Sequence, residues 1–273
     1  MAFGSSAFKL SRRRVFDLRA ELKVLFALSK KDIQMRYLGS LVGAGWAVIQ
    51  PVVTVLIYWF LFQFGFRTPA VSNIPFILWF VPALISWNFM ADALLNGTNA
   101  ITDNVHLVKK MLFRVELLPV IRILSSLYVH MFFILFTAFM TLVYGYGLTV
   151  YLLEVFYYTF CAAFVTMGLV YISSSLAVFI KDIGQIVSVM LQFGFWVTPV
   201  FWPPNHLSGL IRFLVELNPA YYITQGYRDA FVNHEWFWYH LHLTLYFWFV
   251  SSLICFTGIT LMHRLKPHFV DVL

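Results

Sequence analysis

The chain contains few charged residues for its length. Asp, Glu, Lys and Arg make up 11% of its 273 residues, whereas a soluble domain carries about a quarter. Hydrophobic residues make up 61% and aromatic residues 19%. This composition excludes an ordinary water-soluble domain and indicates a protein largely surrounded by lipid.

The chain also lacks the common motifs of catalysis and nucleotide binding. It has no G-x-x-x-x-G-K-[ST] loop, no H-E-x-x-H, no G-x-S-x-G and no Cys/His cluster at metal-ligand spacing. We therefore expect no metal site and no enzymatic activity in this chain. Uphill transport would need energy from another chain or from an ion gradient.

Cysteine is scarce as well. Cys161 and Cys255 both lie in apolar runs, which excludes a disulfide framework and is typical of small buried residues. Charges run through the first forty residues with no apolar core before them, so we expect no cleavable signal peptide.

Six long apolar runs occupy most of the chain. About 20 apolar residues span the hydrocarbon core, and we predict spans at 42–66, 75–97, 117–144, 152–178, 184–202 and 237–263. The predicted fold is all-α, a polytopic membrane protein with a six-span domain at 42–263. An N-terminal arm (1–41) precedes this domain, and a short tail (264–273) follows it.

Lys and Arg concentrate on one side of the predicted spans. That side holds 16 of the 19, and the other side holds Arg67, Arg212 and Arg228. Because Lys and Arg stay in the cytoplasm during insertion, both termini are predicted to be cytoplasmic. This bias also accounts for the net charge of +7 without a nucleic-acid partner, and an anionic inner leaflet would attract the arm.

The arm is predicted to form an amphipathic helix over residues 16–38. One face collects the residues Leu18, Leu22, Leu25, Phe26 and Ser29. A helix with such a face and basic residues around it is typical of the membrane interface. A solvated basic helix packed on the protein is the alternative. GxxxG spacing at Gly39 and Gly43, with Gly45 beside it, predicts close helix packing.

Polar residues within the predicted spans are few. Asn88, Asp92 and Asn96 recur every four residues and share one helix face. They either face a hydrated path or form a polar seam against a neighbouring helix. For His130, deep in the third span, a hydrogen bond to another helix is favoured over a metal or proton role.

The segment between the last two spans, 203–235, is too polar to cross a membrane. Asn218-Pro219 divides it, because Pro disfavours a helical conformation in the residue before it. One short helix is predicted before this break and another from about 220 to 231. The pair either re-enters the membrane as a gate or rests on the surface as a lid.

Four stretches resemble one family. They are KKDIQMRYLGSLVGAGWAVIQP (30–51), NVHLVKKMLFRVELLP (104–119), FIKDIGQIVSVMLQFGFWVTPVFWPP (179–204) with LNPAYYITQGYRDAF (217–231), and the tail HRLKPHFVDVL. Their order resembles the transmembrane subunit of polysaccharide ABC exporters, the permeases for O-antigen, capsule and teichoic acid. The family usually has Arg-Asp where this chain has Lys181-Asp182, and often Pro where it has Arg114.

The resemblance implies a homodimer that binds two copies of a separate ATPase. ATP and Mg²⁺ would belong to that partner, so this chain would hold no cofactor. Residues 104–114 match the cytoplasmic coupling segment, and the arm matches an interface helix that also meets the ATPase. The residues expected at the ATPase are Leu107, Lys109, Lys110, Arg114, Lys31 and Arg36.

The resemblance also implies a channel lined by the first and fifth spans, with residues 203–235 as short external gate helices. The gate residues would be Asn218, Pro219, Tyr221 and Tyr222. Because flat aromatic rings can stack on sugar rings, we predict a substrate path along Tyr58, Trp59, Phe62, Asn88, Asp92, Phe193, Phe195 and Trp196. One helix cannot turn all of its aromatic residues inward, so about half of them should face elsewhere.

The predicted function is the membrane subunit of an ATP-driven exporter. It would move a lipid-linked polysaccharide across the bacterial inner membrane. An ABC permease for a drug or simple lipid shares this architecture. A membrane transferase for lipid-linked sugars would need a base such as Asp92, Glu154 or a His, and an ion-coupled carrier or channel would work without ATP.

Overall fold

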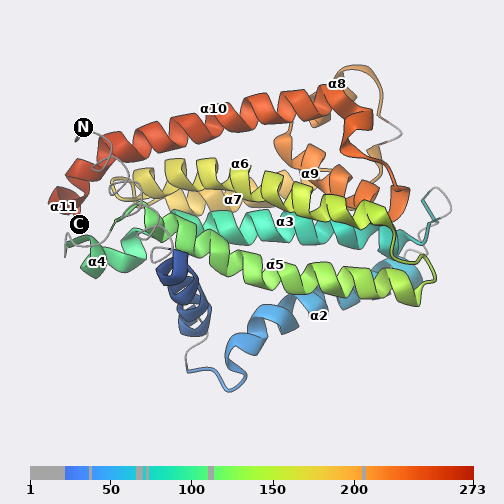
Figure 1. Ribbon diagram of the computed structural model, residues 1–273, viewed down its shortest axis with the longest axis horizontal. Coiled ribbons are helices and arrows are strands. Elements are labelled where there is room, and N and C mark those ends of the chain that lie inside the picture. The colour runs from blue at the N-terminus through green and yellow to red at the C-terminus, as the bar shows by residue number, and fades with distance from the viewer. Residues whose placement is uncertain (1–21, 37–38, 66–69, 72–73, 110–113, 205–206) are drawn as a thin grey trace, which may run out of the picture.

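The computed structural model describes residues 22–36, 39–65, 70–71, 74–109, 114–204 and 207–273. Within these ranges the regular elements are helical, apart from an isolated bridge between Val71 and Ile74. The long helices lie side by side (Figure 1) and are α2 (Trp46–Phe60), α3 (Phe76–Thr98), α5 (Leu117–Val143), α6 (Glu154–Ala177), α7 (Ile183–Val197) and α10 (Leu241–Leu265). The short ones are α4 (Val105–Lys109), α8 (Gly209–Glu216), α9 (Pro219–Arg228) and α11 (Phe269–Val272). Residues 22–36 form a further helix, called here the arm helix.

Within the part of the chain that the structure describes, five helical stretches are long and apolar enough to cross a membrane. They are Trp46–Gly65, Phe76–Thr98, Leu117–Val143, Val150–Ala177 and Phe237–Val272, and they coincide with five of the predicted spans. The remaining one, predicted at 184–202, is the shorter apolar helix α7. It ends early because Thr198 is extended (φ −75°, ψ 131°), the conformation that a following proline favours.

Helix α3 is the centre of the bundle. Its apolar window is 78% buried, the highest share among the five stretches. Helices α5, α6, α7 and α9 pack around it. A helix that is apolar over most of its surface is stable only when neighbours cover that surface, and the position of α3 meets that need.

Glycines allow close backbone contact between α6 and α10. A Cβ atom at Gly168 would lie 2.7 Å from Cys255 Cα, and one at Gly258 would lie 2.4 Å from the Gly168 carbonyl oxygen. Small residues allow such backbone contact between membrane helices. The interhelical packing predicted from Gly39 and Gly43 is wrong, because both have positive φ in the turn before α2 and a Cβ there would meet nothing within 4 Å. At Gly45 a Cβ would meet only the local side chains of Val42 and Ile49.

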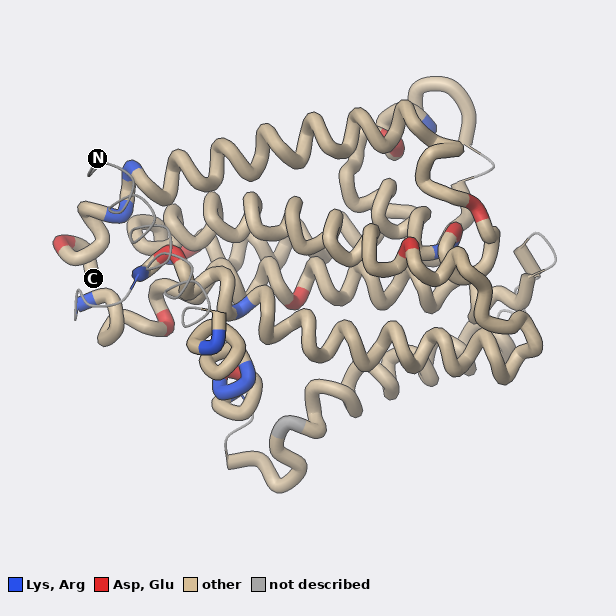
Figure 2. The backbone as a smooth tube through the Cα atoms, viewed as in Figure 1, with Lys and Arg blue, Asp and Glu red and all other residues tan. Residues whose placement is uncertain are grey.

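The two ends of the bundle differ in charge. The arm helix, α4 and α11 lie at one end, and α8 and α9 lie at the other (Figure 1). Among the described Lys and Arg residues, Arg212 and Arg228 belong to the second end and the rest to the first (Figure 2). At the first end, the buried side chains of Val108, Leu118 and Phe269 share an apolar cluster that joins α4 and α5 to α11.

The arm helix runs crosswise to the long helices (Figure 1). Leu25 and Ser29 on its predicted apolar face are buried, and Ser125 Oγ of α5 donates a hydrogen bond to the Ser29 carbonyl (3.0 Å). Leu22 and Phe26 of the same face are half-exposed. Leu18 lies outside the described residues.

The variant Gly168→Ala should destabilise the protein, because its methyl group would meet the α10 backbone. We expect a loss of about 1–3 kcal/mol and a Tm lower by several degrees. Thermal unfolding of the purified protein in detergent measures this. The control is Gly65→Ala, whose Cβ would meet only Leu61 Cδ1 at 3.4 Å. Equal Tm values for the two variants would contradict the proposed role of the α6–α10 contact.

Candidate functional site: a lined cavity and an adjacent charged network

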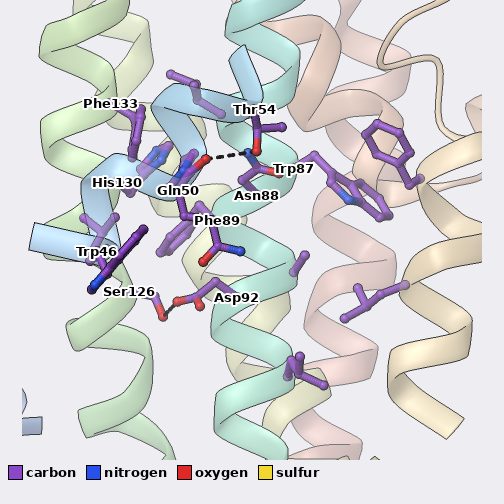
Figure 3. A pocket seen from close by; sticks show the side chains of 18 of the residues that line it. Trp46, Gln50, Thr54, Trp87, Asn88, Phe89, Asp92, Ser126, His130 and Phe133 are labelled. Atoms are coloured by element: carbon purple, nitrogen blue, oxygen red, sulfur yellow. Dashed lines mark hydrogen bonds between the residues drawn. The ribbon is translucent and has the colours of Figure 1, made fainter. Parts of the chain in front are cut away.

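A cavity of about 660 Å³ lies between the arm helix, α2, α3, α5 and α7 (Figure 3). Large apolar and aromatic side chains form much of its wall, among them Trp46, Tyr58, Trp87, Phe89, Phe133, Phe195 and Trp196. Polar side chains also line it: Gln50, Thr54, Asn88, Asp92, Ser126, His130, Ser188 and Gln192. Sites for organic ligands are typically built in this way, with a mostly apolar wall and a few polar groups that fix orientation.

Five of the eight predicted path residues meet at this cavity: Tyr58, Asn88, Asp92, Phe195 and Trp196. Trp59, Phe62 and Phe193 are not in its wall. Phe62 packs on Phe76 of α3 with ring centroids 4.5 Å apart, and Phe193 is 70% exposed. Sequence analysis missed Trp46, Trp87 and the α5 residues, because which helix faces meet is set by tertiary packing.

Asp92 both lines the cavity and anchors neighbouring elements. It accepts hydrogen bonds from Ser126 Oγ of α5 and from Asn96 Nδ2 (2.7 Å). Arg36 of the arm helix lies 3.4 Å from the same carboxylate. The alternative of a polar seam agrees with these contacts of Asp92 to α5 and the arm helix. Asn88 and Asp92 also line the cavity, and the hydrated path stays a prediction.

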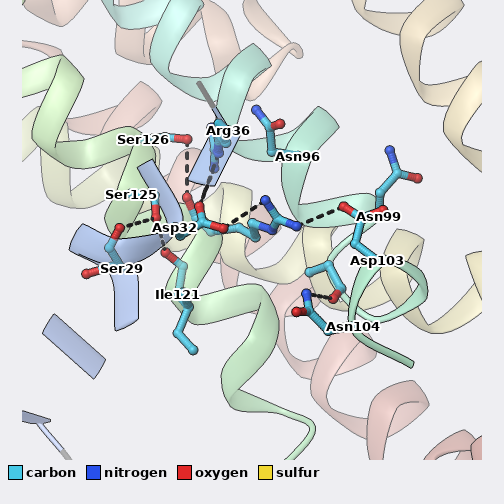
Figure 4. A network of polar contacts seen from close by, with 12 residues as sticks. Ser29, Asp32, Arg36, Asn96, Asn99, Asp103, Asn104, Ile121, Ser125 and Ser126 are labelled. Atoms are coloured by element: carbon cyan, nitrogen blue, oxygen red, sulfur yellow. Dashed lines mark hydrogen bonds and ion pairs between the residues drawn. The ribbon is translucent and has the colours of Figure 1, made fainter. Parts of the chain in front are cut away.

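A network of ion pairs extends from Asp92 toward α4 (Figure 4). Arg36 pairs with Asp32 (3.0 Å), Arg122 of α5 pairs with the same Asp32 (2.9 Å), and Arg122 also pairs with Asp103 (2.8 Å). Asp103 lies two residues before α4. Its burial raises the pKa of its carboxyl group, although Arg122 opposes this shift. The network thus connects the cavity to the start of the segment 104–114.

The residues predicted to meet the ATPase are spread over this end of the molecule. Lys31, Lys109 and Arg114 are exposed. Leu107 is partly buried against the apolar cluster of Val108 and Phe269. Arg36 lies in the wall of the cavity, and Lys110 lies outside the described residues.

The predicted gate residues lie at the other end of the bundle, where they cap α9 and bind it to neighbouring helices. Asn218 caps α9 by accepting from Ala220 N (3.0 Å) and donates to Thr198 Oγ1 (2.8 Å), while Pro219 is its first helical residue. Tyr221 and Tyr222 are buried. The Tyr222 hydroxyl shares hydrogen bonds with Tyr157 of α6 and Thr244 of α10, both at 3.0 Å.

Arg228, a residue that sequence analysis did not single out, holds α9 to the ends of α3 and α7. Its fully buried guanidinium donates to the carbonyls of Trp79 (3.1 Å), Pro199 (2.7 Å) and Val200 (2.6 Å). It also stacks on the Trp79 ring, 3.6 Å from the centroid. Carbonyls left without helical partners where α7 ends are thereby satisfied.

The prediction for His130 is confirmed. Its Nε2 atom shares a hydrogen bond of 2.6 Å with the Tyr227 hydroxyl of α9, which in turn lies 2.6 Å from Thr159 Oγ1 of α6. Three helices are therefore joined by one buried polar chain beside the cavity.

One group among the described residues has the spacing of a metal site. Asp229, Glu235 and His240 bring ligand atoms within 4.8 Å of one another. Their protein contacts account for this arrangement: Asp229 accepts from Gln225 (3.0 Å) and Asn233 (2.7 Å), and Glu235 lies 3.1 Å from His240 Nε2.

With this geometry established, comparison with known proteins identifies the family. The family described as ABC-2 type transporter matches residues 23–232. The chain belongs to that family. It is therefore the membrane subunit of an ABC transporter, a transport protein and not an enzyme, and the family implies pairing with an ATPase partner.

Curated relatives cover most of the chain. An O-antigen export system permease protein RfbA of Klebsiella pneumoniae is 22% identical over 267 residues, which is 97% of this chain and 100% of the relative. A protein of the same name from Myxococcus xanthus is 26% identical over 225 residues, which is 82% of this chain and 85% of the relative.

The variant Arg122→Gln should loosen the arm helix, because it removes the ion pairs to Asp32 and Asp103. We expect amide hydrogen exchange within residues 22–36 to be at least about fivefold faster, equivalent to about 1 kcal/mol. The matched control is Arg212→Gln, which breaks an exposed pair with Glu216 in α8. Unchanged exchange in the Arg122 variant would show that the network does not hold the arm helix.

Proposed function

We propose that this protein is the membrane subunit of an exporter that moves a lipid-linked polysaccharide from the cytoplasmic to the external side of a bacterial inner membrane. Six spans form its membrane domain at 42–263, with α7 as the fifth. The arm 1–41 and the tail 264–273 are cytoplasmic. ATP and Mg²⁺ belong to a separate ATPase, present in two copies.

The lining of the cavity carries this proposal. Aromatic rings at Tyr58, Phe195 and Trp196 supply flat surfaces for sugar rings, and Asn88 and Gln192 supply hydrogen-bonding groups for hydroxyls. The names of the relatives, which are O-antigen export permeases, support the same cargo class.

A second copy of the chain would complete the path. A volume of about 660 Å³ suits a ligand of drug size, not a polymer, so a channel needs a further wall. Two of the helices that border the cavity have little cover: the α2 stretch is 11% buried, and Val187 is the buried residue of α7. Pairing of two copies through α2 and α7 would join two cavities into one channel.

The crosswise arm helix and the basic end support the orientation. The arm helix would lie in the cytoplasmic interface, with Leu22 and Phe26 toward lipid. Lys109 and Arg114 flank the segment that would receive the ATPase. Movement of this segment would reach the cavity through the ion-pair network of Asp103, Arg122, Asp32 and Arg36.

A permease for a drug or simple lipid is the rival within the same family. Depletion of the protein in its native cell, followed by extraction of lipid-linked saccharides and assignment of their membrane face, separates the two. A finished polymer should accumulate on the cytoplasmic face and clear when the wild-type chain is restored. Normal surface glycan without accumulation would favour the rival.

The pairing of copies through α7 predicts a specific cross-link. Phe193→Cys should give a disulfide-linked dimer under mild oxidation in membranes, because its side chain lies on the exposed face of α7. Phe249→Cys on α10 is the control, since the two phenylalanines are 70% and 71% exposed. The native Cys161 and Cys255 are buried and should contribute little. A dimer from the Phe249 variant alone would contradict the proposed interface.

A further inference from the structure

A single carboxylate faces the cavity. Among the described residues of the cavity wall, Asp92 is the one with an acidic side chain (Figure 3). This side chain is 47% exposed, whereas Arg36 and Asp32 of the same ion-pair network are 17% and 15% exposed. The carboxylate of Asp92 is therefore the charge that the network presents most openly to the cavity.

The hydrogen bonds of Asp92 leave room for one more donor. A carboxylate has about four acceptor sites and donates nothing. Asn96 Nδ2 occupies one site on Oδ1, while Ser126 Oγ and Arg36 Nη1 occupy two on Oδ2. A sugar hydroxyl can donate to the remaining site on Oδ1. A carboxylate of an acidic sugar cannot, because it is itself an acceptor with the same charge.

The cation nearest to Asp92 is held by another carboxylate. Arg36 Nη2 and Nε lie 3.0 Å and 3.1 Å from Asp32, and Nη1 lies 3.4 Å from Asp92. The network as a whole contains two guanidinium groups, those of Arg36 and Arg122, and three carboxylates, those of Asp32, Asp92 and Asp103. Its carboxylates thus outnumber its cations, and an acidic ligand in the cavity would meet net negative charge.

The other polar side chains of the described wall do not compensate an anion. They include uncharged amides and hydroxyls: Gln50, Thr54, Asn88, Ser188 and Gln192. His130 is buried and shares its Nε2 hydrogen bond with Tyr227. Amides and hydroxyls form good hydrogen bonds with sugar hydroxyls, but a full charge that leaves water needs an opposite charge as its partner.

We propose that Asp92 determines which class of sugar the cavity accepts. It favours neutral sugar rings, whose hydroxyl groups donate to Oδ1, and it disfavours rings that carry a carboxylate. The inference rests on the proposed function and adds to it a cargo class, a glycan of neutral sugars. If two copies join their cavities into one channel, two such carboxylates face the cargo, and a cleft with apolar walls strengthens their field.

Trigalacturonic acid and its methyl ester are a matched pair of probes, because they share their rings and differ in charge. Saturation-transfer NMR on the purified full chain in detergent should show that the neutral ester binds about tenfold more tightly, since like charges repel strongly in a partly dry cavity. Equal affinities would refute the role of Asp92 and leave the proposed function in place. Absence of binding by both probes would instead contradict the sugar path, and with it both proposals.

The variant Asp92→Asn removes the charge and keeps the size of the side chain. The preference for the neutral ester should fall to within about twofold. Asp103→Asn is the matched control, because it removes a carboxylate of the same network that lies outside the cavity wall, and it should keep the tenfold preference. Equal effects of the two variants would rule out Asp92 as the residue that selects the sugar.

A second pair of variants keeps the test decisive if Asp92→Asn fails to fold. Gln192→Glu adds a second carboxylate to the cavity wall and should increase the preference for the neutral ester at least about threefold. Gln185→Glu places the same charge on an exposed residue of α7 outside the wall and should leave the preference unchanged. An unaltered preference in the Gln192 variant would overturn the proposal independently.

Discussion

The end of the bundle that carries α8 and α9 depends on one buried cation, the guanidinium of Arg228. A guanidinium group out of reach of water must have its donors satisfied by oxygen atoms, and Arg228 meets this need with three backbone carbonyls and the face of Trp79. The same contacts allow α7 to end at Thr198, because backbone groups freed within a membrane must find partners in the protein. Helices α3, α7 and α9 are thereby joined at one residue.

At the basic end, several ion pairs join the elements, whereas Arg228 alone does so at the end with α8 and α9. Asp32 accepts from both Arg36 and Arg122, so the arm helix and α5 share one carboxylate. Arg122 also pairs with Asp103, which connects both of them to the start of the α4 segment. Arg36, Asp32 and Arg122 are largely buried and Asp103 is half-exposed, so salt screens these pairs less than pairs on the open surface. One end of the molecule is thus held by a single buried cation, and the basic end by several ion pairs.

Much of the fold could be predicted because lipid leaves few alternatives. The spans near α2, α3, α5, α6 and α10 follow from apolar length alone. Helix α7 ends early because Pro199 follows Thr198. The predicted span ran on to residue 202 because it was based on apolar residues alone. The Gly39–Gly43 spacing misled because a glycine can serve a turn with positive φ as well as a helix contact.

The candidate site was predictable only in part. Helical periodicity was sufficient to predict that Asn88 and Asp92 lie together, because both residues belong to one helix. Trp46 and Trp87 reach the cavity through the rotation of α2 and α3, and local sequence does not set this rotation. Arg228 entered the sequence analysis only in the charge count, because an arginine in a polar segment usually lies in water.

The glycine contact between α6 and α10 has a mechanical consequence. Backbones that touch at Gly168 and Gly258 cannot slide past each other without a steric clash. Helices α6 and α10 should therefore move together as one rigid unit, with α3 packed against α6. Displacement during a transport cycle then falls to α2 and α7, which few neighbours restrain. The helices that move would then be α2 and α7, which have little cover in the bundle.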